Sequence, residues 1–153
     1  MAHLHFEQLM QVPLDEVFAF HANPYNLLKI TPPALGMKVT NKEPVIMAEG
    51  AEITYQIRWL GIPLNWRTII TCYDPPRSFT DVQAKGPYKK WIHTHTFISE
   101  GTATRIIDDV EYELPLGILG EIVAGRLIRR QLNQIFSYRS AILANLISDQ
   151  KEP

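Results

Sequence analysis

Residues 102–148 read TATRIIDDVEYELPLGILGEIVAGRLIRRQLNQIFSYRSAILANLIS, and the spacing of apolar residues changes abruptly within this stretch. Before Pro115, apolar and polar side chains alternate, which predicts a β-strand from Thr102 to Leu114. After Pro115, apolar residues recur every three or four positions, which predicts an amphipathic helix from about Gly117 to about Ser148. At the standard rise, this helix is roughly 45 to 50 Å long, enough to cross an entire curved sheet.

Residues 36–101 also alternate, in short runs separated by turn signals. Glycine, proline and polar residues between the runs suit hairpins and short turns. We therefore expect a continuous antiparallel meander, with its next-to-last strand from Tyr88 to Ser99. The positions that share a face in the earlier runs are Met37 and Val39; Ile53, Tyr55, Ile57 and Trp59; Leu64, Trp66, Thr68 and Ile70; and Phe79, Asp81 and Gln83.

The N-terminal part of the chain predicts one further strand and two short helices. Alternation from Leu4 to Val12 indicates a strand with one buried face, and it places His3 and His5 on the solvated face. Helical spacing from Leu14 to Ala22 predicts a short helix, and a second one fits between Asn23 and Thr31. The expected order of one strand, two short helices, six strands and a long helix is an α+β arrangement known as the helix-grip fold.

The length and charge of the chain limit its class. A chain of 153 residues is long enough for one core, so we expect a single domain over residues 1–153, with a polar tail at 149–153. The chain has 15 Lys and Arg residues and 16 Asp and Glu residues. It therefore lacks the excess of positive charge that is typical of proteins that bind nucleic acids or anionic membranes. Residues 1–7 show no secretion signal, and no run of about eighteen apolar residues occurs. We expect no nucleic-acid partner and no stable membrane insertion.

Cys72 is the only cysteine of the chain. An internal disulfide is therefore impossible, cysteine-rich metal sites are excluded, and the cytoplasm is the expected location. Because Cys72 lies within a predicted strand, we expect it to be a small buried hydrophobic residue. Phosphate-binding glycine motifs and a nucleophile elbow are absent from the sequence.

The stretch WIHTHTF at residues 91–97 is the main candidate for a functional site. Successive side chains of a strand point to opposite faces, so Trp91, His93, His95 and Phe97 share one face. A purely structural face would be aliphatic. Two imidazoles between large aromatic rings are typical of a cavity with an apolar body and a few polar groups, which predicts a small-molecule site.

Two aspartates are expected to join these histidines. The strand that carries Asp81 pairs with the strand that carries His93 and His95, and Asp108 approaches from the strand on the other side. A carboxylate next to an imidazole fixes its tautomer and raises its pKa. Such a pair serves to bind a polar ligand group or to transfer a proton.

Three interpretations of these polar residues stay open. In the first, they orient a ligand by hydrogen bonds to its oxygen atoms, with Gln83 as a further member. In the second, a His/Asp pair drawn from His93, His95, Asp81 and Asp108 catalyses an aldol cyclisation or dehydration, while Arg67 or Tyr55 stabilises an enolate. In the third, the polar groups only satisfy each other in a buried network. Whether the protein is an enzyme is therefore left open.

Other polar residues receive simpler interpretations. His-x-His on a strand offers two metal ligands, but no further metal-binding signature accompanies it, so we expect no metal and no cofactor. His21 is interpreted as a packing residue. Three lysines surround the turn before Trp91, and they are candidates to attract an acidic ligand if that turn lies at the mouth of the cavity; they are Lys85, Lys89 and Lys90.

Three arginines lie early in the long helix, and we interpret them as part of its solvated face; they are Arg126, Arg129 and Arg130.

Several local sequence motifs, in addition to the order of strands and helices, indicate a resemblance to a known family. The chain resembles the SRPBCC (START-like) superfamily, particularly its polyketide cyclase/dehydrase-like branch of small bacterial proteins. The matching motifs are PLDEVFAFHANP from Pro13, ITPP from Ile30, GIPLNWRT from Gly61, DPPRSF from Asp74, GPYKKWIHTHTF from Gly86 and DVEYELPLG from Asp109.

The resemblance implies a seven-stranded antiparallel sheet wrapped around the C-terminal helix, with an elongated cavity for lipids, isoprenoids, polyketides or similar ligands. It implies no particular reaction, because fold membership leaves function open. A partner-binding regulatory module that uses the outer sheet or the exposed helix face is a further alternative, and the oligomeric state is not predicted. The expected ligand-binding residues are Tyr55, Trp59, Trp66, Phe79, Asp81, Gln83, Trp91, His93, His95, Phe97, Asp108 and Tyr112.

Overall fold

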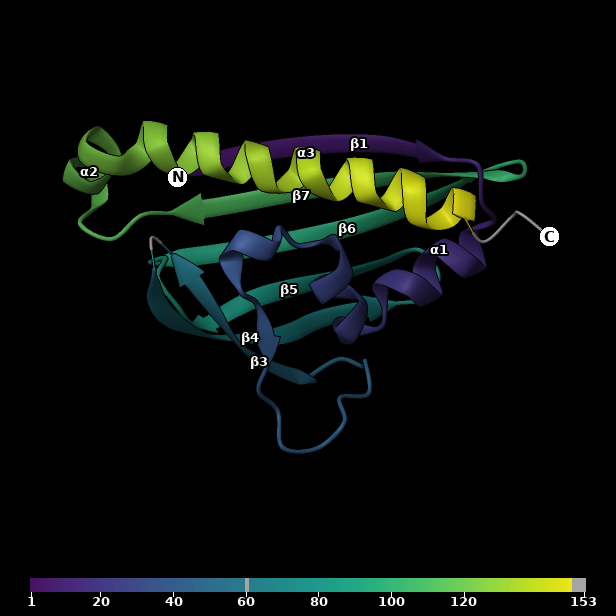
Figure 1. Cartoon of the computed structure of the whole chain (residues 1–153), viewed down its shortest axis with the longest axis horizontal. Helices are drawn as coiled ribbons and strands as arrows, with labels where there is room; N and C mark the ends of the chain where they lie inside the picture. The colour runs from purple at the N-terminus through teal and green to yellow at the C-terminus, as the bar shows by residue number, and fades with distance from the viewer. Residues whose placement is uncertain (60, 150–153) are drawn as a thin grey trace.

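The computed structural model describes residues 1–59 and 61–149 of the chain. Within these residues, seven antiparallel strands form one bent sheet, and a long C-terminal helix lies across one face of it (Figure 1). Shorter helices cover the remainder of the same face, in front of the middle strands. The expected α+β helix-grip fold is therefore confirmed.

The strands follow the chain as a meander, except that the first strand returns to pair with the last. Their order across the sheet is β1-β7-β6-β5-β4-β3-β2. The strands are β1 (Ala2–Met10), β2 (Lys38–Val39), β3 (Glu52–Trp59), β4 (Ile62–Asp74), β5 (Ser78–Lys85), β6 (Lys90–Glu100) and β7 (Ala103–Glu113). The helical segments are α1 (Leu14–His21), the 3₁₀ turns η1 (Pro24–Ile30) and η2 (Pro33–Leu35), α2 (Gly117–Gly120), the π-helical η3 (Glu121–Gly125) and α3 (Arg126–Asp149).

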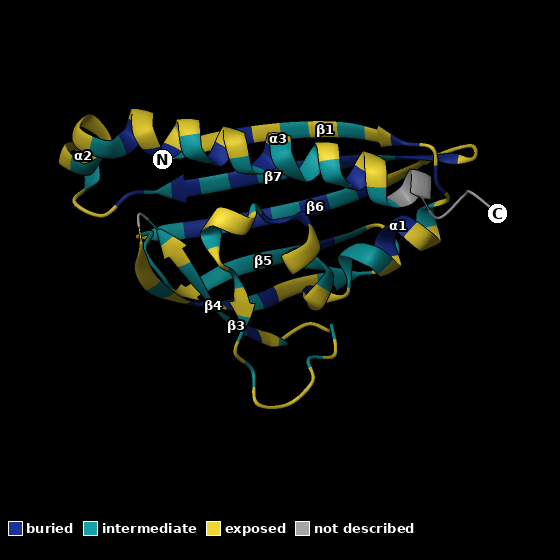
Figure 2. Cartoon of the chain, in the orientation of Figure 1, coloured by how far each residue is buried: buried dark blue, intermediate teal, exposed yellow. Residues whose placement is uncertain are grey.

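The period-two pattern of the sequence becomes an inner and an outer sheet face. In β6, the buried positions are Trp91, His93, His95 and Phe97, while the residues between them are partly exposed. Figure 2 shows the same alternation along β6 and β7. On the outer face of β1, His5 donates to Asp109 at 2.7 Å, so its predicted solvated position is confirmed.

Cys72 is exposed, and the prediction that it is buried is wrong. The pairing of β4 with β5 shifts between Ile70 and Cys72, which marks a bulge or irregularity. An extra residue in a strand reverses the alternation beyond it. As a result Ile70 is 1% exposed, whereas Tyr73, rather than Cys72, packs against the ring of Phe18.

The C-terminal helix also differs in detail from the expected regular helix. Leu116 has a positive φ of 66°, and the first turns pass through a π-helical segment before α3 begins. A Cβ atom at Gly120 would lie 1.9 Å from the carbonyl oxygen of Pro115. The helix therefore starts close against the end of β7, which requires glycine at this position.

Two groups of buried side chains form the core. One surrounds α1 and includes Val17, Phe18 and Phe79. The other lies between the sheet and α3 and includes Trp66 and Phe136. Residues of both groups also line a cavity between the sheet and the helices, so the interior is not closed by packing.

Candidate functional site

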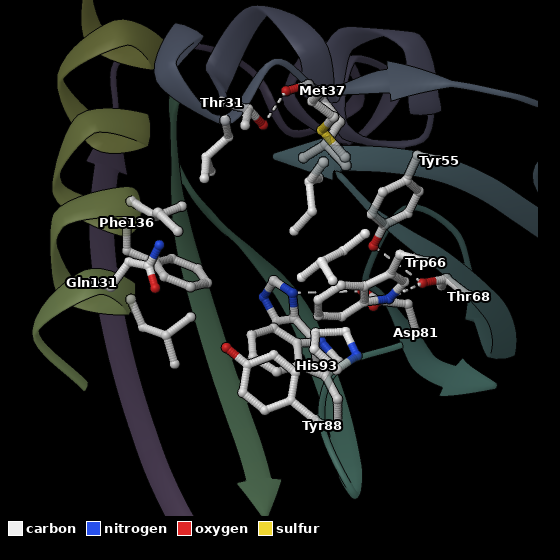
Figure 3. A pocket seen from close by; sticks show the side chains of 18 of the residues that line it. Thr31, Met37, Tyr55, Trp66, Thr68, Asp81, Tyr88, His93, Gln131 and Phe136 are labelled. Carbon is white, nitrogen blue, oxygen red and sulfur yellow. Dashed lines mark hydrogen bonds and ion pairs between the residues drawn. The ribbon is translucent and has the colours of Figure 1, made fainter. Parts of the chain in front are cut away.

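The space between sheet and helices holds a cavity of about 530 Å³. Strands β3 to β6 form its floor, while η1 and α3 form its walls (Figure 3). Its lining is mostly aliphatic and aromatic, with Asp81 and the two histidines on the floor and a few other polar groups on the walls. Eight of the expected ligand-binding residues line it, and these are Tyr55, Trp59, Trp66, Phe79, Asp81, Trp91, His93 and His95.

The other four expected residues lie elsewhere on the inner face. Gln83 holds the turn before β6, because its amide bonds both backbone groups of Tyr88. Phe97 packs edge-on against Phe18 in the core. Tyr112 is fully buried, with its ring centroid 5.7 Å from that of Tyr88. The fourth residue, Asp108, lies behind the histidines. Strand alternation places all four side chains on the inner face, but other side chains separate them from the cavity.

The two histidines and two aspartates form one buried cluster, as the strand pairing predicts. Asp81 pairs with His93 across β5 and β6, and His95 pairs with Asp108 across β6 and β7. His93 Nε2 donates to Asp108 Oδ1 at 2.8 Å, and His95 Nε2 donates to Asp81 Oδ2 at 3.0 Å. The two imidazole centroids are only 3.8 Å apart. We call these four residues the His/Asp cluster.

Burial and charge act in opposite directions on the pKa values of the His/Asp cluster. Burial raises the pKa of Asp108, but the hydrogen bonds and charges of both histidines outweigh it and hold this pKa well below its usual value. Burial likewise lowers the pKa of His95, but its two carboxylate contacts raise it overall. The pKa of His93 is lowered by burial and by the charge of His95. Of the two imidazoles, His95 therefore has the higher pKa.

Arg139, on α3, is a cavity residue that the sequence analysis did not identify. Its guanidinium carbon lies 4.7 Å from the ring centroid of Phe136. Its Nε is buried without a hydrogen-bond partner, and among the described residues no carboxylate forms an ion pair with it. The helical spacing of Arg139 from Leu132 and Phe136 is the signal that could have located it.

The charge of Arg139 reaches the polar side of the cavity. Burial raises the pKa of Asp81, but the hydrogen bond and charges of the two histidines, together with the charge of Arg139, lower it overall. Arg139 and three members of the cluster, Asp81, His93 and His95, line the same cavity.

The prediction that Arg67 stabilises an enolate in the cavity is wrong. Its side chain is 47% exposed on the outer face, and it lies 3.7 Å from Glu52. Trp66 and Thr68 point inward, so strand alternation turns Arg67 outward. Tyr55, the alternative candidate, lines the cavity, and its hydroxyl lies 3.3 Å from that of Thr68. Burial raises the pKa of this tyrosine.

The remaining polar candidates also have definite places. His21 contacts the Val17 carbonyl through Nδ1 at 2.8 Å and packs against Phe97, as expected of a packing residue, but it also lines the cavity. Pro87 of the turn before β6 lines the cavity, whereas Lys85, Lys89 and Lys90 do not. Lys89 instead forms an ion pair with Glu113. The arginines early in α3 are exposed, as expected.

Residues 10–136 match the family model described as polyketide cyclase / dehydrase and lipid transport. The chain belongs to this family. A search among curated proteins finds no match to the chain. The family assignment agrees with the fold, and it confirms the SRPBCC resemblance of the sequence motifs.

Solved structures show the same fold at low sequence identity. TTHA0849 from Thermus thermophilus is 16% identical, with a TM-score of 0.72, and the match covers 99% of this chain and 100% of that one. A START superfamily protein from Mycobacterium smegmatis is 10% identical, with a TM-score of 0.70 and coverage of 97% and 99%. The di-domain ARO/CYC protein BexL of the BE-7585A biosynthetic pathway is 17% identical, with a TM-score of 0.71; the match covers all of this chain and 48% of BexL. At these identities the likeness shows the fold alone.

Proposed function

We propose that this polyketide cyclase/dehydrase-family protein binds a small, largely apolar ligand that carries an acidic oxygen group. The cavity of about 530 Å³, with a mostly apolar lining and a few polar groups, is the observation that carries this proposal. Small-molecule sites in proteins usually have this volume and this make-up. A lipid, isoprenoid or polyketide-like molecule has a matching hydrocarbon body.

The environment of Arg139 indicates that the ligand carries an acidic group. A buried guanidinium nitrogen without a partner is costly, and a carboxylate or enolate supplies the missing acceptor. Tyr55 and three members of the His/Asp cluster, Asp81, His93 and His95, line the same cavity. A ligand whose oxygen atoms face Arg139 and the cluster would leave its hydrocarbon against the aromatic rings.

Acid–base catalysis in the same cavity is the second candidate function. His95 contacts two carboxylates, at 3.0 Å and 2.9 Å, and lines the cavity, so a proton carrier lies where a substrate would bind. A linear poly-β-ketone analogue should then cyclise or lose water, and His95→Gln should remove this turnover while the variant stays folded. Turnover that survives His93→Gln and His95→Gln would contradict this function.

Ligand binding can be tested with a fluorescent fatty acid such as cis-parinaric acid. Ile57→Trp places an indole in the cavity and should weaken binding at least about tenfold through steric overlap. Ile98→Trp, on the exposed outer face of β6, is the matched control and should bind normally. Arg139→Met should weaken binding of the acid about 10–100-fold but leave binding of its methyl ester unchanged.

Native mass spectrometry of the chain purified from its own host provides an independent measurement. A retained non-covalent ligand of defined mass supports the proposal. A bare mass, together with no probe binding by the unmodified chain, contradicts it.

Two further expectations accompany this proposal. Among the described residues, no helix is long and apolar enough to span a membrane. We propose the cytoplasm as the site of action because the chain has only one cysteine. Single-domain organisation over residues 1–153 is likewise proposed. A partner-binding regulatory module, the remaining alternative, would require an exposed interaction surface, and the exposed apolar surface of the chain is considered below.

A further inference from the structure

Three side chains on the cavity floor direct donor atoms towards one another. Asp81 Oδ2 lies 3.0 Å from His95 Nε2 and 3.5 Å from His93 Nδ1. One donor atom from each of the three residues lies within 4.8 Å of the other two. The strand pairing of β5 with β6 produces this arrangement, because it sets Asp81 opposite His93 and next to His95.

The two separations from Asp81 Oδ2 are those of ligands around one transition-metal ion. Imidazole nitrogens and carboxylate oxygens bind Zn²⁺ at about 2.0–2.2 Å, so two such ligands lie roughly 3.0 Å apart at a right angle and roughly 3.4 Å apart at a tetrahedral angle. The distances from Asp81 Oδ2 to the two nitrogens match these values. Two histidines and one carboxylate are also a common ligand set for Zn²⁺ and Fe²⁺.

Asp108 occupies the position of a supporting carboxylate. It contacts the opposite ring nitrogens, His93 Nε2 at 2.8 Å and His95 Nδ1 at 2.9 Å, although the second contact lies outside hydrogen-bond geometry. Carboxylates in this position orient metal-binding histidines and keep the proton on the nitrogen that faces away from the metal. In the metal-bound form, His95 Nε2 loses the proton that it donates to Asp81, and the lone pairs of His93 Nδ1 and His95 Nε2 point towards the ion.

The charges of the cluster also suit a cation. Asp81 and Asp108 bring two carboxylates into a buried site, where their side chains are 15% and 13% exposed. Buried carboxylates require compensating positive charge. A divalent ion with two neutral imidazoles balances both carboxylates, and its remaining coordination positions face the cavity.

We propose that Asp81, His93 and His95 bind one divalent transition-metal ion, with Asp108 as the residue that positions the two imidazoles. The expectation of no metal site came from the absence of a further motif, since sequence spacing does not show the convergence of these three donors. The proposal is independent of the ligand-binding function, because it concerns the metal alone.

The test uses the untagged full chain, stripped with a chelator and titrated with Zn²⁺ or Co²⁺. One ion per chain should remain after dialysis, and Co²⁺ should give visible absorption bands of a low-symmetry site. Asp81→Asn and His95→Gln should abolish retention, and Asp108→Asn should weaken it about 10–100-fold. Far-ultraviolet circular dichroism establishes that each variant is folded.

His5→Gln is the matched control, because His3, His5 and Asp109 form an exposed His/Asp group on the outer face. This variant should retain the ion. Anomalous scattering from a Zn²⁺-soaked crystal, which needs no variant, should give a peak between Asp81, His93 and His95. Zn²⁺ retention that is lost in His5→Gln, or a Zn²⁺-soaked crystal without that peak, would overturn the proposal.

A separate observation concerns the start of the C-terminal helix. Six large apolar side chains there are 56% to 84% exposed, and we call them the mouth patch. This end of the helix extends past the sheet (Figure 1), and three patch members also line the cavity. Exposed apolar clusters of this kind mark interaction sites. The mouth patch consists of Leu116, Ile118, Leu119, Ile122, Val123 and Leu127.

Positive charge next to the mouth patch indicates what covers it. Arg126, Arg129 and Arg130 are exposed and lie on either side of Leu127, the last residue of the patch, and the only acidic residue among residues 116–130 is Glu121. Apolar side chains flanked by arginines on one helix are typical of segments that lie in the interface of anionic lipid membranes. We infer that the mouth patch docks the protein, reversibly, on an anionic lipid surface with the cavity opening towards it.

Vesicle co-sedimentation tests this inference. The chain should bind vesicles that contain phosphatidylglycerol, less so at high salt, and not pure phosphatidylcholine vesicles. Ile122→Glu should remove binding, whereas Ile98→Glu on the outer sheet face should not. If the chain does not bind anionic vesicles, the inference is wrong. If the chain forms a dimer that Ile122→Glu dissociates, the mouth patch binds a protein partner instead of a membrane.

Discussion

At the scale of single residues, the His/Asp cluster depends on alternation in three adjacent strands. Asp81, His93, His95 and Asp108 each occupy an inward position, and antiparallel pairing brings them into contact. The sequence was sufficient to predict these neighbours. It was not sufficient for the distances, which depend on the twist of the sheet and on side-chain rotamers.

The buried acid of the cluster should contribute much more stability than its exposed neighbour. Asp108→Ala removes one of the two carboxylates that contact the buried histidines and should lower the free energy of unfolding by about 3–5 kcal/mol. Asp109→Ala removes only exposed contacts with His3 and His5 and should cost less than about 1 kcal/mol. Urea unfolding of both variants measures the difference, and equal effects would contradict it.

His21 should make the protein less stable in mild acid. Burial lowers its pKa to about 4, against the opposing effects of the Val17 carbonyl and the Asp108 charge, while the charges of His95 and Arg139 add to the lowering. Above pH 6.5 the residue is neutral in both states and has no effect. Below this pH the unfolded chain takes up the proton first, so stability falls as the pH falls towards 4.

The His21 effect should reach about 2 kcal/mol at pH 5, and His21→Gln should remove it. The measurement is the free energy of unfolding of both proteins at pH 7 and pH 5. His3→Gln, on the exposed outer face, is the control. An unchanged pH dependence in His21→Gln would show that His21 does not titrate in this way.

At the scale of elements, periodicity predicted the type of each strand and helix but not its irregularities. The bulge in β4 turns Cys72 outward, and the π-helical η3 interrupts the long helix after α2. The first irregularity lies where β4 pairs with β5, and the second lies close to where the helix begins against the end of β7. Such adjustments are tertiary, because a regular element would satisfy the local sequence equally well.

Two helix glycines should respond in opposite ways to alanine. At Gly120 the added Cβ meets the Pro115 carbonyl oxygen at 1.9 Å, a backbone atom that cannot move away, so Gly120→Ala should destabilise the fold by about 1–3 kcal/mol. At Gly125 the nearest atom belongs to the flexible side chain of Glu121. Gly125→Ala should therefore be neutral or stabilise by up to about 1 kcal/mol. Thermal unfolding of the two variants distinguishes the outcomes.

At the scale of the whole molecule, the cavity results from the shapes of its two main parts. A bent sheet and a straight helix meet along two groups of side chains and leave space between them. Aromatic residues at the expected positions line much of this space. Arg139 completes the lining from the helix, where a broadly polar sequence pattern did not distinguish it from solvated arginines.

An occupied cavity should raise the stability of the whole fold. A ligand at 100 times its Kd stabilises the folded state by about 2.7 kcal/mol, which corresponds to a Tm increase of roughly 5–10 °C for a chain of this size. Differential scanning fluorimetry with cis-parinaric acid measures this shift. Ile57→Trp should show a smaller shift at the same concentration, and an equal shift would place the ligand outside the cavity.

By itself, the sequence determined the element order, the inner and outer faces of the strands, and the four members of the His/Asp cluster. These follow from local periodicity and from hairpin connections, which are properties of neighbouring residues. Only the tertiary structure decided that Arg139 faces the cavity, that Arg67 and Cys72 do not, and that three donor atoms converge near Asp81. Those outcomes depend on how the helix docks, where a strand bulges and how the sheet bends, and no local pattern encodes them.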